Sequence, residues 1–178
     1  MKLILIDGGP AAGKNTLGKL LVEKFFDLGE KAILLDLDTY VEKYNPKWIW
    51  EKDDQKQTDQ KNARVDFSKD INRYLKENDV VLVIGERFLT TEDVHNFISK
   101  ISAVCAVYLY HLSVPFELRE KRLRDRGPHS LINLAKDQKD RDTVKEWPGY
   151  VYQNINFPEK DAINLMKLIQ DAQGLINL

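Results

Sequence analysis

The residues best suited to chemistry in this sequence form a short loop near its start, IDGGPAAGKNT, residues 6–16. Gly8, Gly13 and Lys14 fit the spacing G-x-x-x-x-G-K between a strand-like run and a segment of helical periodicity. Small residues let consecutive backbone N–H groups point at a phosphate chain, and the following helix dipole adds to that field. We therefore expect nucleotide binding, with Lys14 reaching the β- and γ-phosphates. The expected contact residues are Gly8, Gly9, Pro10, Ala11, Ala12, Gly13, Lys14, Asn15 and Thr16.

The rest of the sequence alternates between short strand-like runs and longer segments of helical periodicity. That alternation is typical of a parallel β-sheet with helices on both faces, and it predicts a three-layer α/β sandwich. None of the strand-like runs alternates cleanly between polar and apolar residues, so both faces of the sheet should be buried. The five runs expected to form the sheet are residues 2–7, 32–38, 80–86, 103–111 and 149–155. The expected helices cover residues 17–28, 67–75, 94–101, 115–127 and 158–169.

Two segments, residues 44–62 and 127–148, fit neither period. The first combines Trp48 and Trp50 with a dense run of charges, and the second is polar and bounded by Gly-Pro and Pro-Gly pairs. Long insertions in an α/β domain are more often covers of a functional site than scaffold, although they can also be solvated loops. We expect an insertion on the acceptor side at residues 44–62, whose tryptophans would stack on a flat acceptor or pack in the core.

Composition and charge exclude several classes of protein. The 178 residues are enough for one domain, and 27 basic and 28 acidic side chains leave a net charge of −1. No bulk field therefore favours nucleic acid or a membrane as a partner. Cys105 is the single cysteine, so it cannot form a disulfide within the chain. The apolar run at the N-terminus is too short for a signal peptide, and we expect a cytoplasmic monomer or homodimer.

Charged side chains stand at the ends of the second and third expected strands. Ligands of open parallel sheets bind beyond the carboxyl ends of the strands, which is the edge that the loop marks. Asp38 is placed there to accept the proton of a hydroxyl acceptor, or to cap the helix that follows. Glu86 can orient Mg²⁺ or its waters and Arg87 can pair with a phosphate, the alternative being a surface ion pair. His111 is interpreted as a polar strand-end residue rather than a catalyst.

The loop sequence GGPAAGKNT resembles the phosphate loop of the P-loop kinases, the superfamily of nucleotide, nucleoside and small-metabolite kinases, and particularly its adenylate kinase form. The resemblance covers nearly the whole chain and implies binding of ATP and Mg²⁺. After Lys14 the usual Ser or Thr ligand of Mg²⁺ is replaced by Asn15. Adenylate kinases share this departure and keep the next threonine, so Thr16 is expected at the phosphates and the metal is expected to be held largely through water. The candidate metal-site residues are Asn15, Thr16 and Glu86.

The strand ends and one helix extend this resemblance. The aspartate pair that ends with Asp38 is similar to the end of strand two in adenylylsulfate and shikimate kinases, where a carboxylate contacts the acceptor hydroxyl. EKRLRDRG resembles the segment that opens a helical lid, and implies a lid at about residues 119–148. In these kinases lid arginines stabilise the moving phosphoryl group, while an ordinary salt-bridged surface is the alternative. The implied lid residues are Arg119 for nucleotide binding, and Arg122 and Arg126 for catalysis.

Together these residues predict an ATP-dependent small-molecule kinase. Lys14 would hold the donor, Asp38 and Arg87 would face the acceptor, and the lid arginines would close the site. The acceptor is interpreted first as a nucleoside or nucleotide and second as a hydroxyl metabolite of the adenylylsulfate or gluconate type. A nucleotide-binding switch without kinase activity is the remaining alternative, which Asn15 keeps open. Asn154 follows the fifth strand, where this superfamily passes the adenine base.

Overall fold

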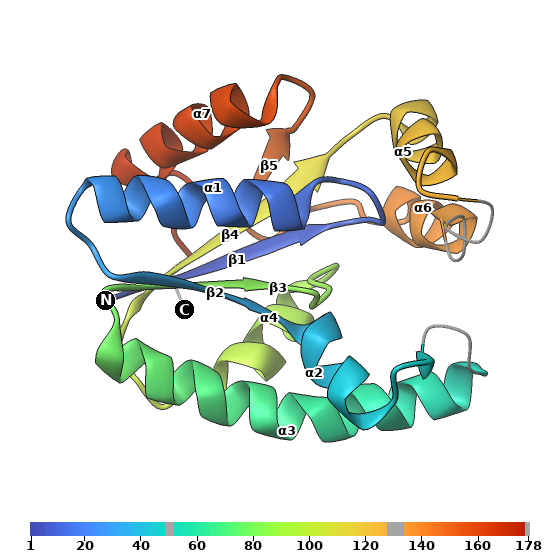
Figure 1. Cartoon of the computed structure of the whole chain (residues 1–178), viewed down its shortest axis with the longest axis horizontal. Coiled ribbons are helices and arrows are strands. Elements are labelled where there is room, and N and C mark those ends of the chain that lie inside the picture. The colour runs from blue at the N-terminus through green and yellow to red at the C-terminus, as the bar shows by residue number, and fades with distance from the viewer. Residues whose placement is uncertain (49–51, 128–133, 177–178) are drawn as a thin grey trace.

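A five-stranded parallel β-sheet forms the centre of the computed structural model, which describes residues 1–48, 52–127 and 134–176 (Figure 1). Its spatial order is β2-β3-β1-β4-β5, and every neighbouring pair is parallel. The strands are β1 (Lys2–Gly8), β2 (Ala32–Asp36), β3 (Val80–Ile84), β4 (Ala106–Ser113) and β5 (Tyr150–Gln153). The chain runs from β1 toward one edge of the sheet and later toward the other, so the carboxyl end of β1 lies at the switch point where such sheets bind ligands.

Helices cover both faces of the sheet and form a group beyond its carboxyl edge (Figure 1). Two helices lie on one face, α1 (Lys14–Asp27) and α7 (Pro158–Gln170). Three lie on the other face, α2 (Leu37–Tyr44), α3 (Asp53–Glu77) and α4 (Thr91–Ile98). The remaining two, α5 (Phe116–Arg124) and α6 (Leu134–Asp142), lie near the carboxyl ends of the strands. The expected three-layer α/β sandwich is therefore confirmed.

The strands are buried on both faces by the helices. Successive side chains point in opposite directions, so each strand contributes to the cores on both faces. In β1, Ile4 and Ile6 join the core under α1 and α7, whereas Leu3 and Leu5 join the core under α2, α3 and α4. All four side chains have no solvent exposure. This double burial explains why the sequence shows continuous apolar runs rather than alternation. No helix within the described ranges is both long and apolar enough to span a bilayer.

Two elements differ from the sequence expectation. β2 ends at Asp36 because its carboxylate caps α2, accepting a hydrogen bond from the backbone N–H of Asp38 (3.1 Å). Most of the 44–62 segment is helical, since α3 begins at Asp53 and runs for 25 residues. Its first turns carry almost no apolar side chains, so no hydrophobic period marks them. They are held instead by polar contacts such as the one from Asn45 to Asp59 (2.9 Å).

The packing of α3 on the sheet generates a stability prediction. Phe67 is fully buried and meets the ring of Tyr40 edge-on, with 5.0 Å between the ring centroids. Phe67→Ala should lower the free energy of unfolding by about 3–5 kcal/mol because it leaves a cavity between α2, α3 and the sheet. Chemical denaturation followed by circular dichroism measures this change. Val65→Ala, on the exposed side of the same helix, is the control and should change stability by less than about 0.5 kcal/mol.

Candidate nucleotide-binding site

The loop between β1 and α1 has the backbone conformation of an anion-binding turn. Gly13, the N-cap of α1, has φ of +94°, and Ala11 also lies in the left-handed region with φ of +57°. Within the described ranges no side chain caps α1, so its first N–H groups are available to a ligand. The amide of Asn154, just after β5, donates to the carbonyl of Ala12 (2.7 Å). Asn154 therefore supports the loop from outside, and among the described residues the N–H of Gly8 is the loop N–H that donates to a side chain, the carboxylate of Asp7 (2.6 Å).

Lys14 lies across the mouth of this loop. Its ammonium group donates to the carbonyl oxygens of Gly8 (2.6 Å) and Gly9 (3.3 Å). Desolvation by burial lowers the pKa of Lys14, while the carboxylates of Asp7 and Asp38 act in the opposite direction. An anion bound in the loop would favour the charged form of this side chain further. The position suits a group that contacts phosphate oxygens.

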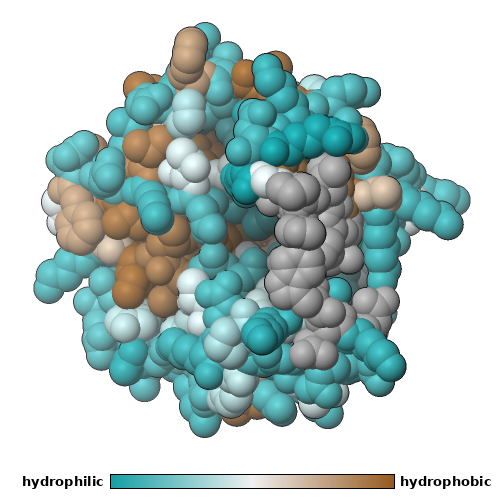
Figure 2. Space-filling view, turned by 45° about the vertical axis from the view of Figure 1, so that its right-hand side comes forward, coloured by the Kyte–Doolittle hydropathy of each residue, from teal (hydrophilic) through white to brown (hydrophobic). Residues whose placement is uncertain are grey.

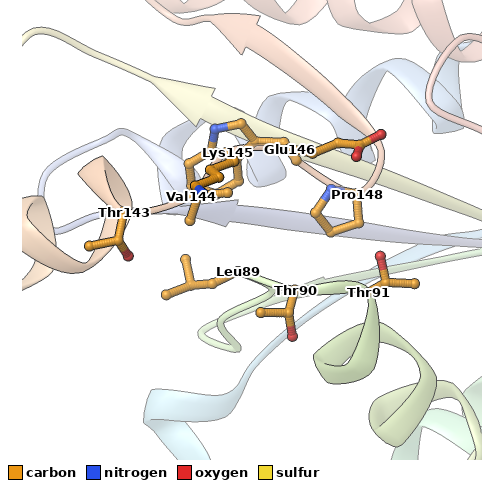
Figure 3. Close-up of a pocket in the computed structure, with 9 residues that line it drawn as sticks. Leu89, Thr90, Thr91, Thr143, Val144, Lys145, Glu146 and Pro148 are labelled. Atoms are coloured by element: carbon orange, nitrogen blue, oxygen red, sulfur yellow. The ribbon is translucent and has the colours of Figure 1, made fainter.

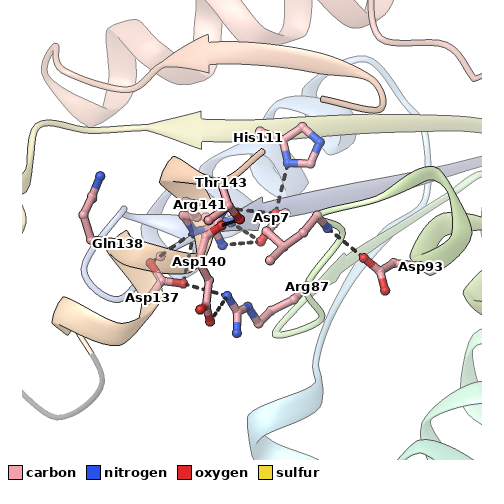
Figure 4. Close-up of polar contacts among 12 residues, drawn as sticks. Asp7, Arg87, Asp93, His111, Asp137, Gln138, Asp140, Arg141 and Thr143 are labelled. Carbon is pink, nitrogen blue, oxygen red and sulfur yellow. Dashed lines mark hydrogen bonds and ion pairs between the residues drawn. The ribbon is translucent and has the colours of Figure 1, made fainter. Parts of the chain in front are cut away.

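A fully buried carboxylate, Asp7, lies in β1 directly before the loop (Figure 4). Arg141 from α6 binds it at two points, with Nη2 to Oδ1 at 2.7 Å and Nη1 to Oδ2 at 3.1 Å. The Nδ1 atom of His111 in β4 lies 3.0 Å from Oδ2. Burial alone would raise the pKa of Asp7, but the hydrogen bonds to His111 and Arg141 hold it well below its usual value. Asp7 thus joins β1, β4 and α6 beneath the loop.

The other nitrogen of His111 is also occupied. Its Nε2 atom lies 2.5 Å from the carbonyl oxygen of Pro148, and its ring lies 4.6 Å from that of Trp147. Both hydrogen-bond partners of the imidazole, the carboxylate of Asp7 and the carbonyl of Pro148, are acceptors. The guanidinium of Arg141 also lies near Trp147, at 5.7 Å from the ring centroid. Residues 147–148 therefore close over the buried Asp7 cluster.

Three arginines converge on a second carboxylate, Asp137 of α6, beside the loop. Figure 4 shows Arg87 and Arg141 beside it. The Nη1 atom of Arg119 in α5 lies 3.1 Å from it, the Nε atom of Arg141 lies 3.1 Å from both of its oxygens, and Arg87 approaches to 3.6 Å. Arg87 also pairs with Asp140 at 3.2 Å. A Cβ atom added at Gly9 would collide with the side chains of Arg119 and Asp137. These charges lie directly against the phosphate loop.

The acceptor-side carboxylates have different surroundings. Asp38 lies in the first turn of α2, where burial and the neighbouring Asp36 raise its pKa to about 6, against the effect of Lys14. Glu86 is buried after β3 and binds Arg64 at two points, 2.7 and 2.8 Å. The structure thus pairs Glu86 with Arg64 rather than with Arg87. Of these two carboxylates, Asp38 is the one whose raised pKa suits it to accept a proton.

Oxygen donors for a divalent cation are present at the start of α1. Asn15 and Thr16 lie exposed in its first turn, and their carbonyl and hydroxyl oxygens are of the type that Mg²⁺ accepts. In the described part of the chain, no group of three or more His, Cys, Asp or Glu side chains is arranged to hold a metal ion. A cation here would therefore take most of its ligands from phosphate and water.

Two pockets open near these residues. One of about 420 Å³ lies between Leu89–Thr91, before α4, and residues 143–148 (Figure 3). The other, of about 220 Å³, reaches Gly9 and is lined by charged side chains that include Arg119 and Arg141. Figure 2 turns the right-hand side of Figure 1 toward the viewer. The surface seen there is mostly hydrophilic, with a hydrophobic area between the polar residues. The site is thus accessible to a polar, anionic ligand.

Comparisons with known proteins agree with this arrangement. The sequence profile of a family described as "Chromatin associated protein KTI12" matches residues 1–86, which include the loop, Asp38 and Glu86. No curated protein sequence gives a match. A shikimate kinase from Aquifex aeolicus vf5 is 20% identical over 97% of this chain and 98% of its own, with a TM-score of 0.58.

Two further structures are similar over almost their full length. A sugar kinase from Janibacter sp. HTCC2649 is 14% identical over 96% of this chain and 95% of its own, with a TM-score of 0.67. The APS kinase CysC of Mycobacterium tuberculosis, solved with AMPPNP and APS, is 14% identical over 95% and 97%, with a TM-score of 0.64. All three are P-loop kinases. This chain has the P-loop kinase fold.

The P-loop kinase fold brings most of the predicted site residues to one edge of the sheet. Residues 8–16, Asp38, Glu86 and Arg87 all follow the carboxyl ends of strands. Of the predicted lid arginines, Arg119 pairs with Asp137 and Arg122 donates to the carbonyl of Ala11 in the loop (3.1 Å). Arg126 differs, because α5 ends at Arg124 and leaves this side chain exposed beyond the helix.

The aromatic and amide residues serve partly as scaffold. Trp48 packs against the core under α2 and α3, while Trp50 lies outside the described residues. Asn154 holds the loop through Ala12, and Asn156 binds Asp161 at the start of α7 (2.8 Å). The side chains of these asparagines are therefore occupied within the protein, and Trp48 belongs to the core rather than to the loop.

Sequence reasoning missed the charged network around Asp7. Asp7 was visible as an acid at the end of an otherwise apolar strand, which is a signal for a buried charge that needs partners. Its partners Arg141 and His111 lie 134 and 104 residues further along the chain. Asp137 and Arg141 lie in a polar segment with no hydrophobic period. Their roles follow only from the contacts that α6 makes at the strand edge.

This network predicts a pH-dependent stability. The depressed pKa of Asp7 means that its ionised form stabilises the folded state above the usual value of 3.8, and that this contribution is lost as the pH falls below it. Asp7→Asn should lower the free energy of unfolding at pH 7 by about 3 kcal/mol or more, because Arg141 then lacks its buried partner. The difference from the wild-type protein should shrink below pH 4.

Urea denaturation between pH 3 and pH 7 measures this difference. Asp27→Asn, at the exposed end of α1, is the matched control and should change stability by less than about 0.5 kcal/mol throughout. Equal stability of Asp7→Asn and the wild-type protein at pH 7 would contradict the prediction.

Proposed function

We propose that this protein is an ATP-dependent kinase that transfers a phosphoryl group to a hydroxyl of a small molecule. The observation that carries the proposal is the meeting of two opposite environments at the carboxyl end of β1. Lys14 and the arginines of α5 and α6 form a cationic side, and Asp38 lies on the other side with a raised pKa. Phosphoryl transfer requires positioned cations for the phosphates and a proton acceptor for the hydroxyl.

The residues at the loop fit a nucleoside triphosphate. The uncapped N–H groups of α1, the ammonium of Lys14 and the guanidinium of Arg122 are donors that surround the loop. The lack of a side chain at Gly9 lets Arg119 and Asp137 approach the loop closely. Mg²⁺ bound to the triphosphate would neutralise charge on the transferred group, with Asn15 and Thr16 as its nearest protein oxygens. Arg119 and Arg141 would stabilise negative charge on the phosphoryl oxygens.

The surroundings of the acceptor-side arginines favour a neutral hydroxyl acceptor. Arg64 is neutralised by Glu86, and Arg73 pairs with Asp70 at 3.0 Å. Arg87 remains as the acceptor-side arginine that reaches the phosphate loop region, and it is shared with Asp137 and Asp140. Shikimate and sugars, for which two of the similar structures are named, carry such hydroxyl groups. We therefore place a nucleoside or a hydroxyl metabolite ahead of a nucleotide acceptor.

A nucleotide-dependent switch is the second candidate function. The match of residues 1–86 to a family described as chromatin-associated favours it, as does Asn15 at the usual position of a metal ligand. ADP release distinguishes the two. A kinase converts ATP to ADP strongly only when its acceptor is added, and a panel of nucleosides, sugars and hydroxy acids tests this directly. A switch would bind ATP without turnover that depends on an acceptor.

Lys14 provides the test of nucleotide binding. Lys14→Ala should weaken ATP binding by about 10- to 100-fold, since a charge-assisted hydrogen bond contributes about 1.5–3 kcal/mol. Isothermal titration calorimetry measures the dissociation constant. Lys19→Ala, exposed on the same helix, is the matched control and should leave binding unchanged. Unaltered ATP affinity in Lys14→Ala would remove the loop from the nucleotide site.

Asp38 provides the test of chemistry. With the acceptor identified by the panel, Asp38→Asn should lower turnover by about 100-fold or more while sparing ATP affinity, since it removes the general base. Because the pKa of Asp38 is about 6, wild-type turnover should rise with pH through that value, and this limb should be absent in the variant. Glu42→Gln, exposed on the same helix, should keep both turnover and the limb. Unchanged turnover in Asp38→Asn would exclude the carboxylate from the reaction.

A further inference from the structure

The side chain of Asp137 occupies the centre of a cluster of three arginines, Arg87, Arg119 and Arg141, which we call the arginine cage. Asp137 is 7% exposed and Arg119 is 3% exposed, so this pair is almost removed from water. The carboxylate lies 3.1 Å from nitrogens of Arg119 and Arg141 and 3.6 Å from Arg87. Three guanidinium groups from three different elements therefore face one small anion.

One carboxylate does not use all the donors of the arginine cage. The Nε atom of Arg119 is buried and, in the described part of the chain, has no hydrogen-bond partner. The distance from Arg87 to Asp137 is longer than a hydrogen bond. A carboxylate offers two oxygens, whereas a terminal phosphate offers three and a larger charge. The unused donor and the long contact both fit an anion larger than the one present.

The location of the arginine cage matches that of a phosphate held by the loop. Asp137 and Arg119 fill the space that a side chain at Gly9 would take. The pocket of about 220 Å³ that reaches Gly9 is lined by Arg119 and Arg141 of the cage. The charge of Asp137 also acts on Lys14, the residue that spans the mouth of the loop. An anion bound in the loop and the carboxylate of Asp137 would therefore compete for the same arginines.

We propose that Asp137 takes the place of a phosphate in the arginine cage and must leave it when the anionic ligand binds. This inference rests on the proposed function, because it assigns the displacing anion as the terminal phosphate of the donor nucleotide. Three guanidinium groups this close repel one another, and two of them, Arg119 and Arg141, have little solvent exposure; Asp137 supplies the anion between them in the ligand-free protein. The same contact reduces ligand affinity in proportion to the fraction of protein whose cage is open.

Binding of anions to Asp137→Asn tests the proposal. The amide keeps the shape of the side chain and removes its charge, so the arginine cage should accept a phosphate without displacing an anion. Calorimetric titration with ATP and with inorganic tripolyphosphate should give dissociation constants about tenfold lower than those of the wild-type protein, as expected if the cage is open about a tenth of the time. Asp125→Asn, exposed just after α5 and outside the pocket that reaches Gly9, is the matched control and should bind like the wild-type protein.

A second measurement covers the case in which Asp137→Asn is too unstable for titration. Tripolyphosphate should then raise the melting temperature of the variant by more than it raises that of the wild-type protein, at an ionic strength matched with sodium chloride. Equal or smaller stabilisation of the variant, or equal or weaker binding, would overturn the proposal and would indicate that Asp137 only positions the arginines.

The outcomes also separate this inference from the proposed function. If the wild-type protein binds ATP and Asp137→Asn binds it no more tightly, Asp137 does not take the place of a phosphate, and the kinase proposal stands. If neither protein binds ATP or tripolyphosphate, both are wrong. If only Asp137→Asn binds them, the inference holds in its strongest form.

Discussion

The buried carboxylate of Asp7 is the constraint on which the rest of the site depends. A charge without solvent exposure inside a parallel strand is strongly unfavourable unless hydrogen-bonded cations surround it. Arg141 supplies the cation from α6, and His111 of β4 lies within hydrogen-bonding distance of the same carboxylate. The pairing fixes α6 against the carboxyl end of β1, and with it Asp137, which lies one helical turn before Arg141. One acid in the first strand thereby determines where the cations above the phosphate loop stand.

The charges near the loop form a chain in which Arg87 and Arg141 are each shared between two acids (Figure 4). Arg87 lies between Asp140 and Asp137, and Arg141 lies between Asp137 and Asp7. Such sharing fixes the guanidinium planes before any ligand arrives, so the displacement of Asp137 is the main reorganisation that the proposed binding requires. The acceptor side has the opposite character, because the carboxylate of Asp38 is partly desolvated and neighbouring carboxylates raise its pKa further. The polarity needed for phosphoryl transfer is thus built into the resting protein.

Local patterns predicted the sheet and the loop well, because apolar runs and glycine spacing report on features within a few residues. The five strands and residues 8–16 belong to this class. Residues 53–62 were not recognised as helix because their side chains face water and show no hydrophobic period. The contacts of Asp137 and Arg141 were out of reach for a different reason, since they join segments more than 100 residues apart or depend on how α6 docks. Arg126 shows the converse limit. The helix expected from the sequence ran to residue 127 and included it, whereas α5 ends at Arg124.

The contact between Asn154 and the carbonyl of Ala12 has a consequence for how the protein is made. The loop lies in the first tenth of the chain, yet its outside support comes from a residue 142 positions later, and the strand before it relies on Arg141. A nascent chain leaves the ribosome from its N-terminus, so the loop emerges long before these partners do. The loop therefore reaches its final shape only after residue 154 has been synthesised, and binding of the proposed nucleotide by the early segment alone is disfavoured.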